Sequence, residues 1–504
     1  MTANTYVPEG PGRKPAVLCV HGHWRGAKQD PVAQSRCIGL AKLGFFVLVV
    51  DAFGAGERGL TKQLGEYHGE MVAATLWPTG LALAGLQVYE NMRAVDYLQS
   101  RAEVDPDRIG ITGASGGGNQ TMYAAAYDER FGCAVPVCSV GTYRAYLGAA
   151  CCMCEMEPRA LAYTEEWGLL AMVAPRALMP INATQDAFQF SVEQAALSFA
   201  GAQQVFELYG QRDRIRHTVF ESKHDYNQAM REAMYGWMTL HLKGEGNGEP
   251  IAEPTIETVD REVLRCFPGE SRPDAFVTVP DFAARAGREI LRTQANPPDH
   301  LEWWETDSRN MLEALSAKAL GPFPARTRIP LEITTAPDGA SRLLQFEPEP
   351  GIAVSAVHEF GRARPRRLAV VIDLGDRQQA ADWEVTEELR SRGYDVMSVE
   401  LRATGDSAYS RDAIGRAPDH NTAEWSLWIG RPLLGQWVWD VSRLLDVVGE
   451  LSSGLLREIT LIGRGPASLV ALAAAALDPR IRQVAAVDSL ATYVSDTPYE
   501  KQRL

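Results

Sequence analysis

The residues with the clearest chemical potential lie in Gly113-Ala-Ser-Gly-Gly117, inside the stretch RIGITGASGGGNQ. This pattern, G-x-S-x-G, is typical of a nucleophile elbow, a strand that turns sharply into a helix and exposes a serine hydroxyl at the apex. The apex backbone is strained and needs small neighbours, and here they are alanine and glycine. The alternatives are a turn with an idle serine and a phosphate-binding loop, but neither G-x-x-x-x-G-K-S/T nor G-x-G-x-x-G follows the strand. We therefore interpret Ser115 as a nucleophile.

A serine is a weak nucleophile unless a base accepts its proton and a carboxylate orients that base. Asp186 and His224 each follow an apolar run that predicts a strand, and the chain order Ser115, Asp186, His224 is that of the α/β-hydrolase arrangement. Taken singly, Asp186 also fits a helix N-cap and His224 a surface loop, and Asp213 or Asp225 could replace Asp186 as the orienting acid. Taken together with the elbow, the three residues predict a catalytic triad.

An acyl-transfer site also needs N–H donors for the oxyanion. The strand AVLCV is followed by His21-Gly22-His23, and a His-Gly loop at this place commonly supplies one donor, here from His23 or Trp24. Gly116, the residue after the nucleophile, supplies the other. His21 and His23 could instead bind a metal, but no third ligand lies near them in the sequence. We expect a backbone role for this loop and no metal.

A substrate pocket is expected beside these groups. The next strand, FFVLVV, ends in the glycine-rich loop DAFGAGERG (51–59), where an α/β sheet places pocket residues. The residues that we expect to line the pocket are His21, Phe53, Glu57 and Trp77.

Parallel strands must bring these residues to one edge of a sheet. Short apolar runs alternate with longer helical patterns, and this alternation predicts a mostly parallel, doubly wound α/β sheet. Together with the elbow and the order of the triad residues, we expect an α/β-hydrolase fold. The predicted strands are 16–20, 44–50, 104–112, 133–140, 174–186 and 215–224, and the predicted helices include 119–131 and 191–210.

Composition excludes several other classes of protein. The chain has 504 residues, 46% of them hydrophobic, and a formal net charge of −14. The length allows about two to four domains, and the charge argues against a nucleic-acid-binding protein, which would carry a basic stripe. The longest apolar runs are far shorter than a membrane span. The N-terminus has no apolar signal region, and the localisation stays open.

The cysteine pattern does not predict a disulfide scaffold. Eight cysteines in a chain of this length are too few and too clustered for one. The run CCMC (151–154) would suit zinc only with a second ligand pair, which the sequence lacks, so we expect free thiols packed near a pocket.

Residues 5–245 resemble bacterial α/β-hydrolases of the acetyl xylan esterase and cephalosporin-C deacetylase-like group, which also resemble dienelactone hydrolases. The stretches that carry the resemblance are AVLCVHGH, DAFGAGERG, LALAGLQVYENMRAVDYLQSRAEVDPDRIGITGASGGGNQ, LLAMVAPRALMPINATQDAF and ESKHDYN. The resemblance is specific for the fold and the triad and weak for the substrate. It implies hydrolysis of carboxylic esters, often of acetylated sugars, without a cofactor.

The second half of the chain repeats the first at an offset close to 350 residues. The shared positions are Gly85, Val88, Arg93 and Asp96, which recur as Gly435, Val438, Arg443 and Asp446. FFVLVVDAFGAGE recurs as YDVMSVELRATGD, and RIGITGASGG as EITLIGRGPA. Any two doubly wound units share a strand–helix rhythm, but the matched Gly, Arg and Asp positions favour a repeat. We expect a second, degenerate α/β-hydrolase-like domain.

This second copy has lost the residues of the elbow. Gly465 takes the position of Ser115, and Pro466, which has no N–H, takes that of Gly116. The nearest hydroxyl, on Ser468, is three residues further on, and IDLGD (372–376) replaces the His-Gly loop. The offset places counterparts of 328–350 before Met1 and of His224 after Leu504, so we expect a chain that is incomplete at both ends.

We therefore expect a catalytic domain at 1–245, a linker and helical connector at 246–325, and the degenerate domain at 326–504. The function expected is a serine hydrolase that cleaves carboxylic esters, with short acyl esters of carbohydrates as substrates and no cofactor. The alternatives are a serine peptidase similar to prolyl oligopeptidase and a non-catalytic, carbohydrate-binding pseudo-hydrolase. We expect no nucleic-acid or membrane partner, and the oligomeric state stays open.

Overall fold

The computed structural model describes residues 1–65, 67–149, 152–294, 298–361, 366–375, 377–452, 456–499 and 503. The chain forms two compact units. The N-unit comprises Met1–Ile290 and Val494–Pro498, and the C-unit comprises Leu291–Tyr493 and Tyr499–Leu504. This division differs from the three segments expected from the sequence, because it cuts through the expected connector.

The connector is divided because its two halves pack against different cores. Arg272 donates hydrogen bonds to the backbone oxygens of Glu57 and Gly59 in the N-unit. Leu320, by contrast, belongs to the hydrophobic core of the C-unit. Each half of the connector is thus an integral part of one unit.

The N-unit is built on an eight-stranded sheet with the order β1-β3-β2-β4-β5-β7-β8, in which β6 also pairs with β5. Strand β1 is antiparallel to β3, and the other pairs are parallel. The strands are β1 (Ala3–Tyr6), β2 (Lys14–Cys19), β3 (Phe46–Val50), β4 (Val104–Ala114), β5 (Phe131–Val137), β6 (Ala177–Leu178), β7 (Ile181–Gln185) and β8 (Thr218–Lys223).

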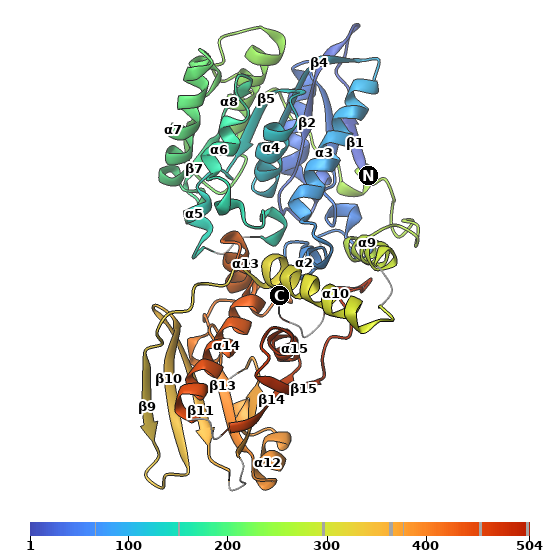
Figure 1. Ribbon diagram of the computed structural model, residues 1–504. Helices are drawn as coiled ribbons and strands as arrows, with labels where there is room; N and C mark the ends of the chain where they lie inside the picture. The colour runs from blue at the N-terminus through green and yellow to red at the C-terminus, as the bar shows by residue number, and fades with distance from the viewer. Residues whose placement is uncertain are drawn as a thin grey trace. The chain divides into compact units, whose positions relative to one another are not determined.

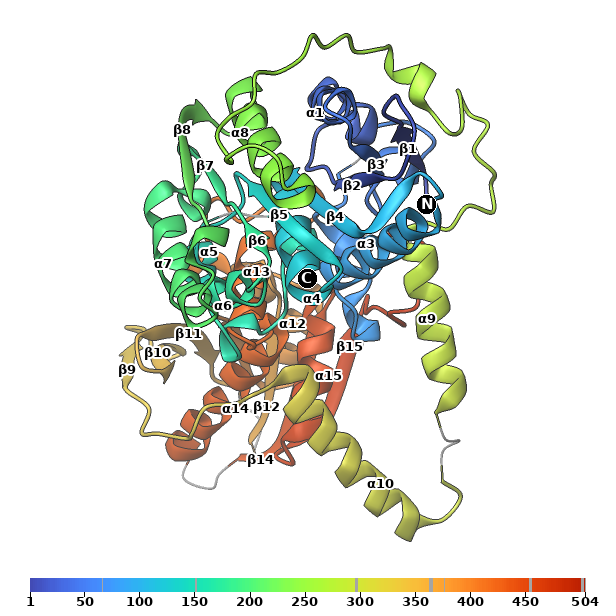
Figure 2. The same cartoon turned by 90° about the horizontal axis from the view of Figure 1, so that it is seen from above.

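Helices cover both faces of this sheet, as Figure 2 shows: α1 and α8 lie on one face, and α3 and α4 lie on the other. The helices of the N-unit are α1 (Pro31–Lys42), α2 (Met71–Ala74), α3 (Leu83–Ser100), α4 (Gly116–Tyr127), α5 (Tyr143–Tyr146), α6 (Glu166–Ala171), α7 (Val192–Leu208), α8 (Gln228–Met238) and α9 (Val279–Thr293). The run FVLVV in β3 is buried along its whole length because both of its faces are covered.

Alternate residues of each strand supply the two cores. Val17, Cys19, Val47 and Val49 pack with Leu40 of α1 and with α8 residues that include Met234 and Trp237. The intervening strand residues point to the opposite face, because successive side chains of a strand alternate. The sheet is therefore a rigid, two-sided support for the loops at its carboxyl edge.

The C-unit has a seven-stranded sheet with the order β15-β14-β12-β13-β11-β10-β9 (Figure 1). Its strands are β9 (Leu331–Thr335), β10 (Ser341–Glu349), β11 (Ile352–Glu359), β12 (Arg366–Ile372), β13 (Asp395–Glu400), β14 (Leu456–Arg464) and β15 (Ile481–Val487). Its helices are α10 (Leu301–Ala314), α11 (Arg377–Ala381), α12 (Glu384–Ser391), α13 (His420–Trp428), α14 (Leu433–Ser452) and α15 (Ala467–Leu477). Strands β12 to β15 pair in parallel.

The two units share the same central arrangement. The order β3-β2-β4-β5 of the N-unit corresponds to β13-β12-β14-β15 of the C-unit. Ile109 pairs with Phe131, and 350 residues later Ile459 pairs with Ile481, with a register shift after this pair in both units. In both units, one arginine also binds two aspartates, and all three residues lie at corresponding positions. Arg130 binds Asp96 and Asp128, and Arg480 binds Asp446 and Asp478.

No single helix among the described residues is long and apolar enough to cross a membrane, although Met71–Thr79 and Leu83–Ser100, bent by 88°, pass that test as a pair.

Candidate active site

The candidate site lies at the carboxyl edge of the N-unit sheet, where α/β folds place their ligands. Ser115 connects β4 to α4, Asp186 directly follows β7, and His224 directly follows β8. Residues separated by more than 100 positions thus reach one edge through three parallel strands.

The backbone at Ser115 has the strained conformation that the motif predicts, with φ 60° and ψ −130°. Residues other than glycine rarely adopt a positive φ, and such strain clusters at functional sites. The N–H of Ser115 donates to the carbonyl of Val137 at 3.0 Å, and its carbonyl accepts from the N–H groups of Gly118 and Asn119. The structure therefore has the strained strand-to-helix turn that the motif predicts at Ser115.

Close packing around the elbow requires glycine at specific positions. A Cβ atom on Gly113 would lie 2.5 Å from the carbonyl oxygen of Gly117 and 2.6 Å from that of Val20. A Cβ atom on Gly22 would lie 2.8 Å from the Cβ of Ser115. The His-Gly loop therefore crosses directly over the elbow, as an oxyanion loop must.

His224 and Asp186 form a hydrogen-bonded pair. His224 Nδ1 donates to Asp186 Oδ1 at 2.8 Å, and the same oxygen accepts the N–H of Ala187 at 2.7 Å. The Asp186 side chain is 1% exposed and that of His224 is 37% exposed. The structure thus pairs His224 with Asp186 and not with Asp213 or Asp225, the two alternatives left open by the sequence. Nε2 of His224 is left for a proton-transfer role.

Opposing influences set the pKa of His224. Burial lowers it, but the hydrogen bond to Asp186 and the negative charges of Asp186, Glu155 and Asp225 outweigh burial and raise it above its usual value. Phe190 stacks on the imidazole ring at 6.0 Å between ring centroids. No hydrogen bond joins Ser115 Oγ to His224 within the described residues, and such bonds often form only when substrate binds.

Cys138 also lies beside this pair, which the sequence did not indicate. Its Sγ lies within 4.8 Å of the polar atoms of Asp186 and His224. Burial and the neighbouring Asp186 carboxylate raise the pKa of the Cys138 thiol to about 12, so the thiol is neutral at pH 7. It fills space beside the triad without adding charge.

The N–H groups of Gly116, His23 and Trp24 donate to no protein acceptor within the part of the chain that the structure describes. Gly116 lies directly beside the His-Gly loop, because a Cβ atom on Gly116 would lie 3.1 Å from His23 Cε1. Unpaired N–H groups beside a nucleophile are the requirement for an oxyanion hole.

The four expected pocket residues have mixed environments. His21 is buried, and its ring bonds the carbonyl of Gly22 and the N–H of Ala52. Glu57 is buried and bound by Lys28 Nζ at 2.6 Å, so it cannot line an open pocket. Phe53 packs under Arg58. Trp77 begins a short 3₁₀ helix, Trp77–Thr79, and is partly buried.

Potential metal ligands lie near His23 in space, although none lies near it in the sequence. His68 and Cys154 approach its ring from two other loops, and Cys152 and Glu155 lie on its other side. Burial lowers the pKa of His23, but the negative charges of Cys152 and Glu155 raise it to about 9. His68 could not be predicted as a potential metal ligand, because neither its flanking residues nor its spacing from other ligands forms a known motif. Cys151 lies outside the described residues, as does Asp376 of the loop that replaces the His-Gly motif.

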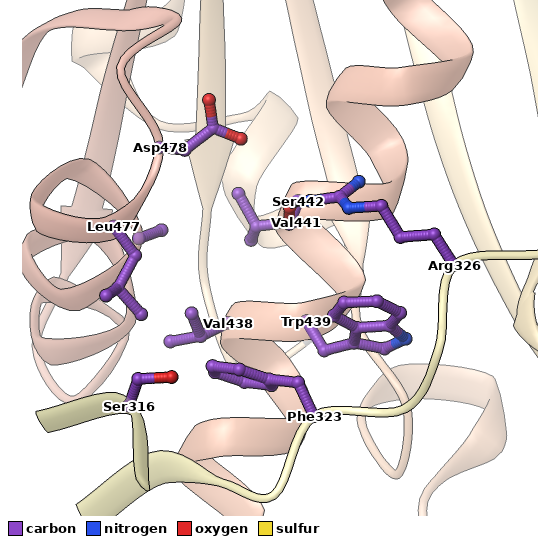
Figure 3. A pocket seen from close by; sticks show the side chains of 10 residues that line it. Ser316, Phe323, Arg326, Val438, Trp439, Val441, Ser442, Leu477 and Asp478 are labelled. Carbon is purple, nitrogen blue, oxygen red and sulfur yellow. Dashed lines mark hydrogen bonds between the residues drawn. The ribbon is translucent and has the colours of Figure 1, made fainter. Parts of the chain in front are cut away.

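The C-unit contains a cavity of about 190 Å³ (Figure 3). Phe323 and Trp439 stack along it, and Arg326 lies over the Trp439 ring. Its charged groups are already paired, Arg326 with Asp446 and Asp478 with Arg480. Its lining residues include no histidine or cysteine, so the cavity offers no set of residues for nucleophilic catalysis.

Comparisons with known proteins agree with this description. The model of the prolyl oligopeptidase family matches residues 82–166, which contain the elbow. "Putative hydrolase YtaP" of Bacillus subtilis (strain 168) is 36% identical over 143 residues, which cover 26% of this chain and 44% of that protein. The chain therefore spans less than half the length of this curated relative.

Two of the solved structures with a similar chain path are named as esterases. "Methylesterase BT1017" is 22% identical, with a TM-score of 0.44, over 57% of this chain and 64% of that chain. "Acetyl xylan esterase from Paenibacillus sp. R4" is 19% identical, with a TM-score of 0.34, over 48% of this chain and 79% of that chain. The family match and the sheet topology confirm the α/β-hydrolase fold and the resemblance to hydrolases of this fold.

Proposed function

We propose that this chain is a serine hydrolase that cleaves carboxylic esters, with short acyl esters of carbohydrates as its substrate class. The observation that carries the proposal is the strained Ser115 at one end of the site and the 2.8 Å His224–Asp186 hydrogen bond at the other. The substrate class rests on the sequence resemblance to acetyl xylan esterases and related deacetylases.

The proposed reaction has two steps. Ser115 Oγ attacks the ester carbonyl while His224 Nε2 takes the serine proton, and the proton then passes to the departing alcohol as the C–O bond breaks. Water then attacks the acyl-enzyme, with His224 again accepting and returning a proton. Asp186 holds the imidazole in the required tautomer, and the N–H groups of Gly116 and of His23 or Trp24 stabilise the oxyanion.

A panel of substrates tests the proposal. The full chain is assayed on p-nitrophenyl acetate, butyrate and octanoate, on acetylated xylan and on a proline-linked amide. We expect turnover of acetyl esters, loss of several powers of ten in kcat for Ser115→Ala, and a loss of about 10⁴ for Asp186→Asn. Equal ester turnover by wild type and Ser115→Ala would contradict the proposal.

The second candidate is a peptidase, and the match of residues 82–166 to the prolyl oligopeptidase family favours it. Such an enzyme would use the same triad, so the variants do not separate the two candidates. The amide substrate does: a kcat/KM on the proline-linked amide that exceeds the value on acetyl esters would establish the peptidase.

We further propose that the C-unit is a degenerate copy without turnover. Gly465 has φ 57° and its N–H donates to the carbonyl of Val487, which reproduces the backbone of Ser115 without its hydroxyl. Pro466 follows it and has no N–H to offer an oxyanion. Such a unit is suited to packing or to binding carbohydrate, the non-catalytic alternative that the sequence left open for this half.

A further inference from the structure

Five metal-ligating side chains converge beside the elbow of the N-unit. His23 comes from the loop after β2, His68 from the loop before α2, and Cys152, Cys154 and Glu155 from the segment around Met153–Glu155, a short 3₁₀ helix. The ligating atoms of His23, His68 and Cys154 all lie within 4.8 Å of one another, as do those of His23, Cys152 and Glu155.

The first of these two sets has the geometry of a coordination site. His23 Nε2 lies 3.1 Å from Cys154 Sγ. With bond lengths near 2.1 Å for Zn–N and 2.3 Å for Zn–S, the nitrogen and sulfur ligands of a tetrahedral zinc lie about 3.6 Å apart. The His23 and Cys154 atoms therefore need to separate by only about half an ångström to hold an ion between them, and the His68 ligand atom lies within 4.8 Å of both.

Both imidazoles also have the support that metal-ligating histidines normally have on the opposite ring nitrogen. His68 Nδ1 lies 2.7 Å from the carbonyl oxygen of Phe53, which holds the proton on Nδ1 and leaves the lone pair on Nε2. His23 Nδ1 faces Glu155 Oε1 at 3.5 Å. Glu155 is itself fixed by Asn119, whose Nδ2 donates to Oε2 at 2.8 Å.

We propose that His23 Nε2, His68 Nε2 and Cys154 Sγ bind one divalent transition-metal ion of the Zn²⁺ class. Two imidazoles and a thiolate favour such an ion over Mg²⁺ or Ca²⁺, which prefer oxygen ligands. Three protein ligands leave a fourth position for water or another small ligand.

The location gives this ion two consequences. It joins three loops that frame the elbow, so its binding stabilises the folded N-unit. It also places positive charge near Gly116, where a Cβ atom would lie only 2.7 Å from Glu155 Oε1. The Glu155 carboxylate therefore lies beside Gly116, and a bound cation would offset its negative charge next to the expected oxyanion site.

The proposal is tested by metal binding, which does not depend on any enzymatic activity. The full chain is purified without a histidine tag, its metal content is measured, and the metal-free protein is titrated with Zn²⁺ against a chromophoric chelator and separately with Co²⁺. We expect one equivalent of Zn²⁺ per chain, a rise in unfolding temperature on binding, and a thiolate-to-Co²⁺ charge-transfer absorption.

Variants identify the ligands. His68→Ala and Cys154→Ser should each weaken Zn²⁺ binding by more than about 100-fold, the upper range for losing only a supporting residue. Cys154→Ser should also remove the Co²⁺ absorption. The matched control is Cys266→Ser, which replaces an exposed cysteine and should bind metal as wild type does.

Two results would overturn the proposal. One is wild-type protein that binds no Zn²⁺ and shows no thiolate–Co²⁺ band, as expected if His23 carries a proton held by Glu155 instead. The other is binding that survives in both His68→Ala and Cys154→Ser but is lost in Cys152→Ser, which would assign the ion to the second set. The Co²⁺ measurement on wild type decides the question even if a variant fails to fold.

Discussion

The strained backbone of Ser115 and the charged Asp186 beside His224 both position groups that the proposed reaction needs. The positive φ holds the hydroxyl at the apex of the turn, and His224 stands at the end of a neighbouring strand with its Nδ1 fixed by Asp186. Neither group is reactive by its own nature, because an isolated serine is weakly nucleophilic and an isolated imidazole is free to turn. In the proposed reaction, the positions of the two side chains make the serine more nucleophilic and fix the orientation of the imidazole.

The pH dependence of the reaction follows from the groups around His224. Burial lowers its pKa, but the hydrogen bond to Asp186 and the charges of Asp186, Glu155 and Asp225 raise it above its usual value overall, and the adjoining Cys138 thiol is neutral. The base must be unprotonated, so kcat/KM should be full above the His224 pKa and fall tenfold per pH unit below it. The pH profile of kcat/KM on p-nitrophenyl acetate measures this decrease, which is the acidic limb of the profile.

Asp225→Asn gives a direct check of the sign. It removes one of the negative charges that raise the His224 pKa, so the acidic limb should move to lower pH while the plateau keeps its order of magnitude. A limb that moved to higher pH would show that His224 is not the base that titrates.

Ser115, Asp186 and His224 could be singled out from the sequence because each follows a recognisable strand and the elbow has a motif of its own. The side chains that surround His23 could not be predicted from the sequence. His68 and Cys154 are separated from His23 by 45 and 131 positions, and only the paths of two irregular loops bring them together. Loop paths depend on tertiary packing and leave no periodic signal in the sequence.

At the scale of elements, the predicted strands and helices agree with the structure to within a few residues. The helix predicted at 191–210 is α7 (Val192–Leu208), and the strand predicted at 133–140 is β5 (Phe131–Val137). The run predicted as one strand at 174–186 is instead two, β6 and β7, because Pro180 lies between Leu178 and Ile181 and has no N–H for the ladder.

Two glycine-to-alanine substitutions should have opposite effects on the stability of the N-unit, one through close packing and the other through helix propensity. Gly113→Ala places a Cβ against the backbone oxygens of Val20 and Gly117 and should destabilise the N-unit by about 1–3 kcal/mol. Gly85→Ala, in α3 with no atom within 4 Å of the new Cβ, should stabilise it by up to about 1 kcal/mol. Thermal unfolding of both variants measures the difference, and a more stable Gly113→Ala would refute the close approach of strand and helix.

At the scale of the whole molecule, the two units share one central strand order, and the proposed catalytic groups lie in the N-unit. The register shift, the arginine–aspartate contacts and the positive φ at the elbow recur at an offset of 350 residues. The strands that present Asp186 and His224 have no counterparts among the described residues of the C-unit. The sequence could predict a repeat because the matched glycine, arginine and aspartate positions keep one constant offset.

The C-unit should hydrolyse no esters even when a serine hydroxyl is introduced at position 465. Gly465→Ser fits sterically, because no atom lies within 4 Å of the new Cβ, and its φ matches that of Ser115. In a Ser115→Ala background this change should restore no ester hydrolysis, because Pro466 has no N–H and no acid–base pair faces the new serine in the described part of the unit. Turnover by the double variant would show that the C-unit retains a working site.

The central claim is that Ser115 is the activated nucleophile of this chain, and covalent labelling tests it most directly. The full chain is treated with a fluorophosphonate, which phosphonylates activated serines, and its intact mass and peptide masses are measured. The account predicts one adduct per chain on the peptide that contains Ser115, none in Ser115→Ala, and much slower labelling in His224→Ala. Labelling of a different residue, or ester hydrolysis that persists in fully labelled protein, would contradict it.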